Sequence, residues 1–79
     1  MNHSVEIYTI PTCSDCNYAK RYFREHEITY KDYNCEEDIK YAEEVYNLTG
    51  KQVVPTIVID DQVFIGFAEN LTEISSLIK

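Results

Sequence analysis

The residues of this sequence with the clearest capacity for chemistry are two cysteines three positions apart, Cys13 and Cys16. Such a pair can pass electrons by opening and closing a disulfide, can ligate a metal, or can form a structural crosslink. A structural disulfide of this spacing closes a very small loop and restricts the unfolded chain little. A zinc site needs about four ligands, and one further cysteine and two histidines are available to complete it. The spacing therefore favours thiol–disulfide exchange, with metal or iron–sulfur carriage through Cys13 as the alternative.

The elements on either side of the pair predict how it is positioned. Residues 4–10 (SVEIYTI) are rich in β-branched and aromatic side chains and predict a strand that Pro11 ends. Apolar residues then recur at helical spacing over residues 14–27, and residues 28–33 alternate as a second strand does. A strand, a helix and a strand in this order predict a right-handed crossover between parallel strands.

The second half of the chain predicts one more helix, a hairpin and a terminal helix. Asn34 is the expected N-cap of the helix, three acids follow it, and Gly50 is the expected stop. Residues 55–60 and 62–66 predict two strands joined by a tight turn. We therefore expect an α/β fold of order β-α-β-α-β-β-α, with a four-stranded mixed sheet and helices on both faces. Residues 1–79 are expected to form a single domain.

In this layout the two cysteines have different environments. Cys13 falls at the junction of strand and helix, where unpaired backbone N–H groups and the helix dipole stabilise a thiolate. A thiolate is the species that attacks a disulfide, so a lowered pKa would activate Cys13. Cys16 lies in the first helical turn and should be less accessible. We expect Cys13 to be the nucleophile and Cys16 to resolve the mixed disulfide.

The sequence resembles the glutaredoxin family, which has a thioredoxin-like fold, over nearly its whole length. The matching stretches are YTIPTCSDC, VVPTIVIDD and IGF followed by a terminal helix, in the order and at the spacing typical of the family. The resemblance implies that the Val54–Pro55 bond is cis. It also implies that the Val54 backbone pairs with substrate, that Pro55 shields the Cys13 thiolate, and that Thr12, Gly66 and Phe67 contribute to substrate binding.

Two departures from the family pattern concern glutathione. Members that bind glutathione usually carry a lysine where this chain has Ile10, and a second glycine where it has Phe67. The Gly66-Phe67 version resembles NrdH-type redoxins and small bacterial and archaeal glutaredoxin-like proteins. This resemblance implies recharging by a thioredoxin-reductase-type flavoprotein rather than by glutathione. It implies client proteins that contain disulfides, with a ribonucleotide reductase as one candidate, and no bound cofactor.

Three single residues leave alternatives open. Gly66 either admits close approach of a ligand backbone or simply ends its strand. Phe67 is either an exposed docking ring or a buried ring that covers the last helix. Cys35 is either a site of glutathionylation or intermolecular disulfide formation, or a small packing residue, since the expected helix start would activate it and the neighbouring acids would oppose its ionisation.

Composition excludes several classes of partner. Fourteen acidic residues against seven basic ones give a net charge of −7, which would repel nucleic acid. No apolar stretch approaches the roughly 20 residues that cross a bilayer. Three cysteines are too few for a disulfide-stapled secreted scaffold. We therefore expect a cytoplasmic protein that acts as a monomer and binds neither nucleic acid nor membrane.

Overall fold

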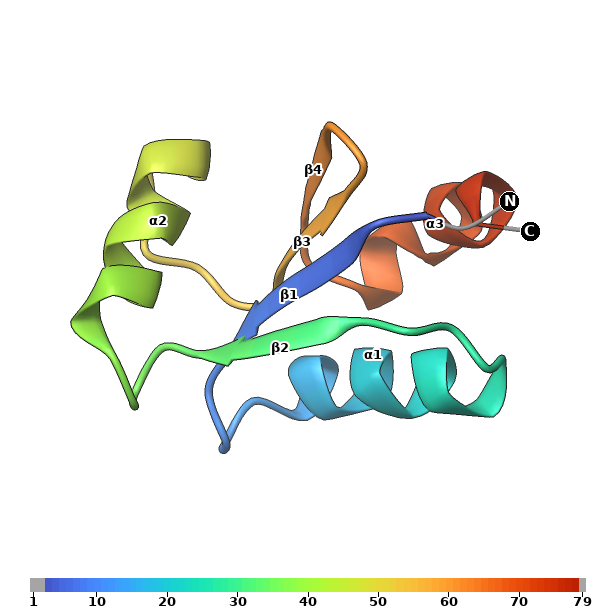
Figure 1. The fold of residues 1–79 in the computed structure, drawn as a ribbon, viewed down its shortest axis with the longest axis horizontal. Coiled ribbons are helices and arrows are strands. Elements are labelled where there is room, and N and C mark those ends of the chain that lie inside the picture. The colour runs from blue at the N-terminus through green and yellow to red at the C-terminus, as the bar shows by residue number, and fades with distance from the viewer. Residues whose placement is uncertain (1–2, 79) are drawn as a thin grey trace.

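Residues 3–78 are described by a computed structural model, and this part of the chain has four strands and three α-helices (Figure 1). In chain order the elements are β1 (Val5–Thr9), α1 (Ser14–Glu25), β2 (Lys31–Asn34), α2 (Ile39–Thr49), β3 (Thr56–Ile59), β4 (Gln62–Ile65), a short 3-10 helix η1 (Ala68–Asn70) and α3 (Leu71–Leu77). The expected order of strands and α-helices is confirmed.

The four strands form one mixed sheet in the order β2-β1-β3-β4. β1 runs parallel to β2 and antiparallel to β3, and β3 and β4 form an antiparallel hairpin. Within this register Tyr8 pairs with Tyr33 on one side and with Thr56 on the other. The ends of β1 and β2 and the start of β3 therefore meet at one edge of the sheet, and the segment with both cysteines leaves from this edge.

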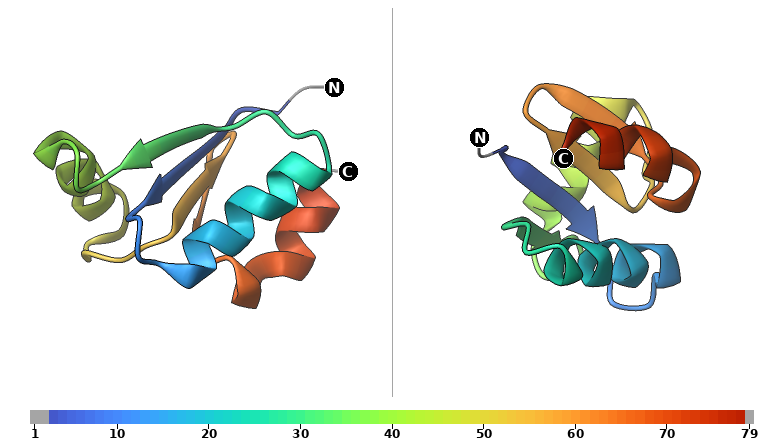
Figure 2. Two further views of the ribbon diagram at one scale, coloured as in Figure 1. Left: turned by 90° about the horizontal axis from the view of Figure 1, so that it is seen from below. Right: turned by 90° about the vertical axis from the view of Figure 1, so that its right-hand side faces the viewer.

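The helices cover both faces of the sheet, as expected. Figure 2 shows α1 and α3 side by side on one face, whereas α2 lies apart from them. The alternating residues of β1 explain this division: Ile7 points into the core shared with Phe23 of α1 and Ile74 of α3, and Tyr8 points to the opposite face. The core residues are Val5, Ile7, Ala19, Phe23, Ile57, Ile59, Phe64, Phe67 and Ile74. No helix within residues 3–78 is long and apolar enough to cross a lipid bilayer.

The second strand begins later than its sequence pattern predicts. The chain leaves α1 through Glu27, whose φ of 57° is left-handed, and the Ile28 N–H donates to the Phe23 carbonyl at 2.8 Å. This arrangement is typical of a helix C-terminus and occupies the residues that would otherwise extend the strand. β2 consequently starts at Lys31.

The second helix also begins later than predicted, and the prediction of Asn34 as its N-cap is wrong. Asn34 still pairs with Thr9 in the parallel ladder, and the Cys35 N–H donates to the Thr9 carbonyl at 2.8 Å. This pairing holds the chain extended beyond the point where the helix was expected. Asp38 is the N-cap instead, and its carboxylate accepts a hydrogen bond from the Lys40 N–H at 2.9 Å.

Candidate active site

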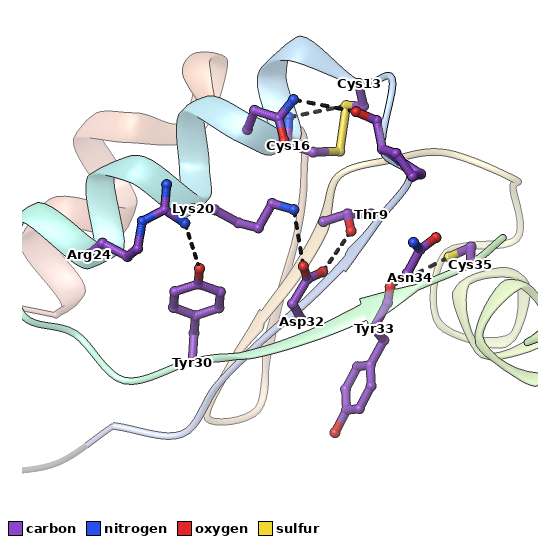
Figure 3. A network of polar contacts seen from close by, with 12 residues as sticks. Thr9, Cys13, Cys16, Lys20, Arg24, Tyr30, Asp32, Tyr33, Asn34 and Cys35 are labelled. Atoms are coloured by element: carbon purple, nitrogen blue, oxygen red, sulfur yellow. Dashed lines mark hydrogen bonds and ion pairs between the residues drawn. A yellow bond between two sulfur atoms is a disulfide. The ribbon is translucent and has the colours of Figure 1, made fainter. Parts of the chain in front are cut away.

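Cys13 and Cys16 are joined by a disulfide at the start of α1, with their Cα atoms 5.2 Å apart (Figure 3). A turn leads into this position, closed by a hydrogen bond from the Cys13 N–H to the Ile10 carbonyl at 3.3 Å. Pro11 occupies the second position of the turn, where its fixed φ is favourable. The turn therefore ends β1 and delivers Cys13 directly to the helix.

Cys13 is the N-cap of α1. Its backbone is extended, with φ −86° and ψ 111°, and its carbonyl accepts a hydrogen bond from the Asn17 N–H at 3.1 Å. Its Sγ accepts a hydrogen bond from the Cys16 N–H at 3.1 Å. A sulfur in this position receives one of the N–H groups that the helix leaves unpaired, and an anionic sulfur receives it more strongly than a thiol does. In this structure the Cys13 Sγ therefore lies at the positive end of the dipole of α1.

The two sulfur-bearing residues differ in accessibility. Cys13 is partly exposed, whereas Cys16 is fully buried with 0% of its surface accessible. Cys16 shares the buried face of α1 with Ala19 and Phe23. An incoming disulfide can therefore reach the sulfur of Cys13 before it can reach that of Cys16.

A polar network lies next to the pair and joins three elements (Figure 3). The Asp32 carboxylate on β2 accepts a hydrogen bond from the Thr9 hydroxyl at 2.6 Å and from the Lys20 ammonium at 3.0 Å. Lys20 lies one helical turn after Cys16. Because both charged side chains are partly exposed, the Lys20–Asp32 ion pair contributes at most about 1 kcal/mol to folding stability. Sequence reasoning missed this network, since it depends on the register that pairs Asp32 with Ile7.

The segment before β3 lies beside the active-site turn. The Val54–Pro55 peptide bond is cis, as the family resemblance implies. Because Thr56 pairs with Tyr8, Pro55 is carried toward the end of β1 from which the cysteine turn leaves. Pro55 is buried, Val54 is partly buried, and Thr12 is exposed within the turn.

Gly66 directly follows β4 and lies beside Pro55, at the same end of the sheet as the cysteine turn. Its N–H donates to the Pro55 carbonyl at 2.9 Å, and its φ is +89°. A Cβ at this position would lie 2.5 Å from Glu69 Oε1. The left-handed backbone favours glycine here, whereas the flexible Glu69 side chain could move aside for a Cβ.

The side chain of Phe67 is buried, which is the second of the two alternatives left open by the sequence. None of its surface is accessible, and its ring lies 5.1 Å from that of Tyr18, 5.4 Å from that of Tyr22 and 5.7 Å from that of Phe23. The ring joins the start of η1 to α1 through aromatic packing. Its contribution to the site is to fix the loop after β4 rather than to offer an exposed docking ring.

Asp15 makes a contact that the sequence does not reveal. Its carboxylate accepts hydrogen bonds from two successive backbone N–H groups, those of Phe67 at 2.9 Å and Ala68 at 3.1 Å. The contact spans more than fifty residues, so local pattern carries no sign of it.

Cys35 lies beyond the end of β2 and outside the disulfide (Figure 3). Its partial burial raises the pKa of the thiol, and the nearby negative charges of Asp32 and Glu44 raise it further. Since α2 begins four residues later, no helix start activates this thiol. Among residues 3–78, no group of three or more histidine, cysteine or acidic side chains is arranged to hold a metal ion.

Comparison with known proteins identifies the family of this chain. Residues 5–65 match the glutaredoxin family model. A glutaredoxin-like 8.6 kDa protein of the rubredoxin operon of Clostridium pasteurianum is 37% identical over 75 residues, covering 95% of this chain and 97% of the relative. The glutaredoxin-like protein NrdH of Lactococcus lactis subsp. cremoris is 33% identical over 63 residues, covering 80% of this chain and 86% of the relative.

A solved structure shows the same fold. The thioredoxin-like protein BC3987 superimposes with a TM-score of 0.84 at 24% sequence identity, covering 95% of this chain and all of that chain. The thioredoxin-like architecture, the cysteine pair in a disulfide at a helix start and the sequence matches agree with one another. This chain belongs to the glutaredoxin family of thiol–disulfide oxidoreductases.

Proposed function

We propose that this protein reduces disulfides in client proteins, with Cys13 as the nucleophile and Cys16 as the resolving thiol. The observation that carries this proposal is the asymmetry of the pair. Cys13 is partly exposed and its sulfur accepts a hydrogen bond from the helix start, whereas Cys16 is fully buried. Of the two cysteines, only Cys13 is both accessible to a client disulfide and placed where the helix start can stabilise a thiolate.

The proposed reaction proceeds in two exchanges. The Cys13 thiolate attacks one sulfur of the client disulfide, forming a mixed disulfide and releasing the second client sulfur as a thiolate that takes up a proton. Cys16 then loses its proton and attacks the Cys13 sulfur, which releases the first client sulfur as a thiol. The client gains two electrons, and the protein is left with the Cys13–Cys16 disulfide seen in the structure.

The edge of the sheet supplies the groups for substrate binding. We propose that the backbone of Val54, just outside β3, pairs with an extended client segment as an added strand would. Pro55 would shield the Cys13 thiolate from water, and Thr12 would contact the client segment from the turn. Gly66 and Phe67 would hold the loop after β4 in position beside the client segment.

The electron donor we propose is a thioredoxin-reductase-type flavoprotein rather than glutathione. Ile10 and Phe67 replace two residues that glutathione-binding members usually carry, and an NrdH protein is among the similar relatives. A ribonucleotide reductase is a candidate client on the same ground. The surroundings that suit this chemistry are those of the cytoplasm, where thiols are kept reduced.

A recharging assay tests this function. Reduction of insulin disulfides would be followed with NADPH and thioredoxin reductase in one arm, and with glutathione, glutathione reductase and NADPH in the other. We expect turnover in the first arm to exceed that in the second by about tenfold or more, and to disappear in the Cys16→Ser variant. Efficient turnover with glutathione alone would contradict the proposed donor, and no turnover in either arm or with dithiothreitol would contradict the function.

A further inference from the structure

β4 is an edge strand of the described sheet, because it pairs with β3 on one side only. Successive residues of an antiparallel strand direct their backbone groups to opposite sides. The Gly66 N–H donates to the Pro55 carbonyl at 2.9 Å, so the backbone groups of Phe64, two residues earlier, also point toward β3. The backbone groups of Val63 and Ile65 consequently point away from the sheet.

Three of these four outward backbone groups have no partner. The Ile65 carbonyl accepts a hydrogen bond from the Asn70 side-chain amide at 2.8 Å. Among residues 3–78, no hydrogen bond outside the strand ladder involves the N–H or carbonyl of Val63 or the N–H of Ile65. Such a row of unpaired groups is where an extended segment adds to a sheet as a further strand.

The outer edge of β4 also lines a groove of about 570 Å³, together with Glu69, Asn70 and Glu73. Val63 and Ile65 are each 39% exposed, so the strand offers apolar surface here. No basic side chain in the described part of the chain lines the groove, and neither Glu69 nor Glu73 forms an ion pair with a described residue. The groove therefore combines unpaired backbone groups, apolar surface and two carboxylates.

The distribution of charge along the chain favours a basic occupant of this groove. Residues 52–78 contain four acidic residues and no basic one, whereas six of the seven basic residues lie between positions 20 and 51. A second copy of the chain would bring a net charge of −7 to this edge, which opposes self-association. A basic segment would be attracted by the same negative field.

The spacing of the two carboxylates also matches that of an added strand. Glu69 and Glu73 are four residues apart in consecutive helical segments, where side chains at this spacing lie about 5–6 Å apart. Alternate side chains of an extended segment point to the same side, about 7 Å apart. A segment paired at Val63 therefore places one side chain beside Val63 and directs the two neighbouring side chains toward Glu69 and Glu73.

We propose that the outer edge of β4 is a docking site for an extended, basic segment of a partner protein, which adds to the sheet as a further strand. Its lysine or arginine side chains pair with Glu69 and Glu73, and an apolar side chain between them covers Val63. The site includes neither Cys13 nor the Val54 backbone, so a docked partner leaves both accessible. This inference goes beyond the proposed function and does not depend on it.

A peptide titration tests this docking site. The probe is a short peptide of alternating valine and lysine with blocked ends, and the matched control carries glutamate in place of lysine. Binding to the full chain, labelled for NMR, is followed at low ionic strength, where exposed charges are least screened. We expect the lysine peptide to shift the amide signals of Val63 and Ile65 saturably, and the glutamate peptide to leave them unchanged.

Variants separate the backbone contribution from the charge. Val63→Pro removes the outward N–H, and proline is tolerated at such a position of an edge strand. It should weaken binding by about tenfold or more, whereas Val63→Thr keeps the N–H and should stay within about threefold. Glu73→Lys should weaken binding of the lysine peptide by about tenfold and allow the glutamate peptide to bind. The matched control Glu37→Lys, in the turn before α2, should do neither.

The proposal is overturned by the absence of saturable binding, by equal binding of the two peptides, or by shifts confined to the other edge strand, β2. Unchanged affinity in Val63→Pro or in Glu73→Lys overturns it as well, and Glu73→Lys alone decides if Val63→Pro does not fold. Light scattering is measured alongside. An oligomer that Val63→Pro converts to a monomer would assign the edge to a second copy of the chain and overturn the proposed partner.

Discussion

Two parallel strands end side by side in this molecule, and a cysteine follows each of them. Cys13 comes four residues after β1, and Cys35 comes directly after β2. Cys13 begins a helix and receives an N–H group on its sulfur. Cys35 is partly buried with two negative charges nearby, and α2 begins only after a turn.

The comparison shows that the backbone after each strand gives the two cysteines different surroundings. The Cys35 N–H is used to continue the parallel pairing with Thr9, and Asp38 takes the N-cap position of the next helix. At the neighbouring strand, Pro11 and Thr12 form a turn that ends the pairing, so that the cysteine itself becomes the N-cap. The surroundings of Cys13 and Cys35 therefore differ because the chain leaves the two strands through turns of different length and shape.

The largest difference between the two cysteines should appear in catalysis. Cys13→Ser should lower disulfide reductase activity by about a thousandfold or more, since it removes the nucleophile. Cys35→Ser should change the activity by no more than about twofold. Insulin reduction with dithiothreitol measures both variants. Comparable losses in the two variants would remove the distinction between the strand ends.

The next difference concerns alkylation. In the reduced protein at neutral pH, iodoacetamide should modify Cys13 about tenfold or more faster than Cys35. A lowered pKa increases the fraction of a thiol that is ionised at this pH, and a raised pKa decreases it. The rate at Cys35 should rise only above the ordinary thiol pKa of about 8.5, because the pKa of Cys35 is raised. By the same linkage, the protonated Cys35 thiol favours the folded state below that pH, and this contribution is lost as the pH rises. Peptide mapping at several pH values would show a contrary order if the assignment is wrong.

The two N-caps should respond differently to substitution. Asp38→Ala should lower the free energy of unfolding by about 1 kcal/mol, because α2 loses the acceptor for its Lys40 N–H group. It should leave the alkylation rate of Cys13 unchanged, since it acts at the other helix. Urea denaturation measures the first effect, with Glu37→Ala as the control for loss of charge. A change in Cys13 reactivity would show that the two helix starts are coupled.

The smallest expected effect is at Asp32, which lies in β2 two residues before its end and accepts a hydrogen bond from Thr9. Its charge is one of the causes that raise the pKa of Cys35, so Asp32→Asn should lower that pKa and increase the alkylation rate of Cys35 by about twofold. Glu44→Gln should act in the same direction by a similar amount. A slower rate in either variant would contradict the electrostatic explanation of the inert thiol.

Much of the fold could be predicted from sequence because each element has a local signal. The alternating apolar residues of β1, the helical spacing of Cys16, Ala19 and Phe23, and the turn before Gln62 lie within short windows. The start of α2 could not be predicted in this way. Asn34 has the chemistry of an N-cap, yet the partner that keeps it extended is Thr9, twenty-five residues earlier.

The features of the candidate site also fall into two groups, those with a local sequence signal and those that depend on distant residues. The cysteine pair and the cis proline could be predicted from short motifs, the second through the family resemblance. The contacts of Asp15 with the loop after β4, and of Asp32 with Thr9 and Lys20, join segments that are distant in sequence. Such contacts depend on the register of the sheet, and the amino-acid types alone do not specify it.

The most direct test of the account is the pKa of the Cys13 thiol. The rate of alkylation of Cys13 would be followed against pH in the Cys16→Ser, Cys35→Ser variant. This variant keeps the backbone N–H of residue 16, which donates a hydrogen bond to the Cys13 sulfur. A midpoint below about 7.5 would agree with a thiolate stabilised by the helix start. A midpoint near the value of about 8.5 that is typical of a free cysteine would contradict it.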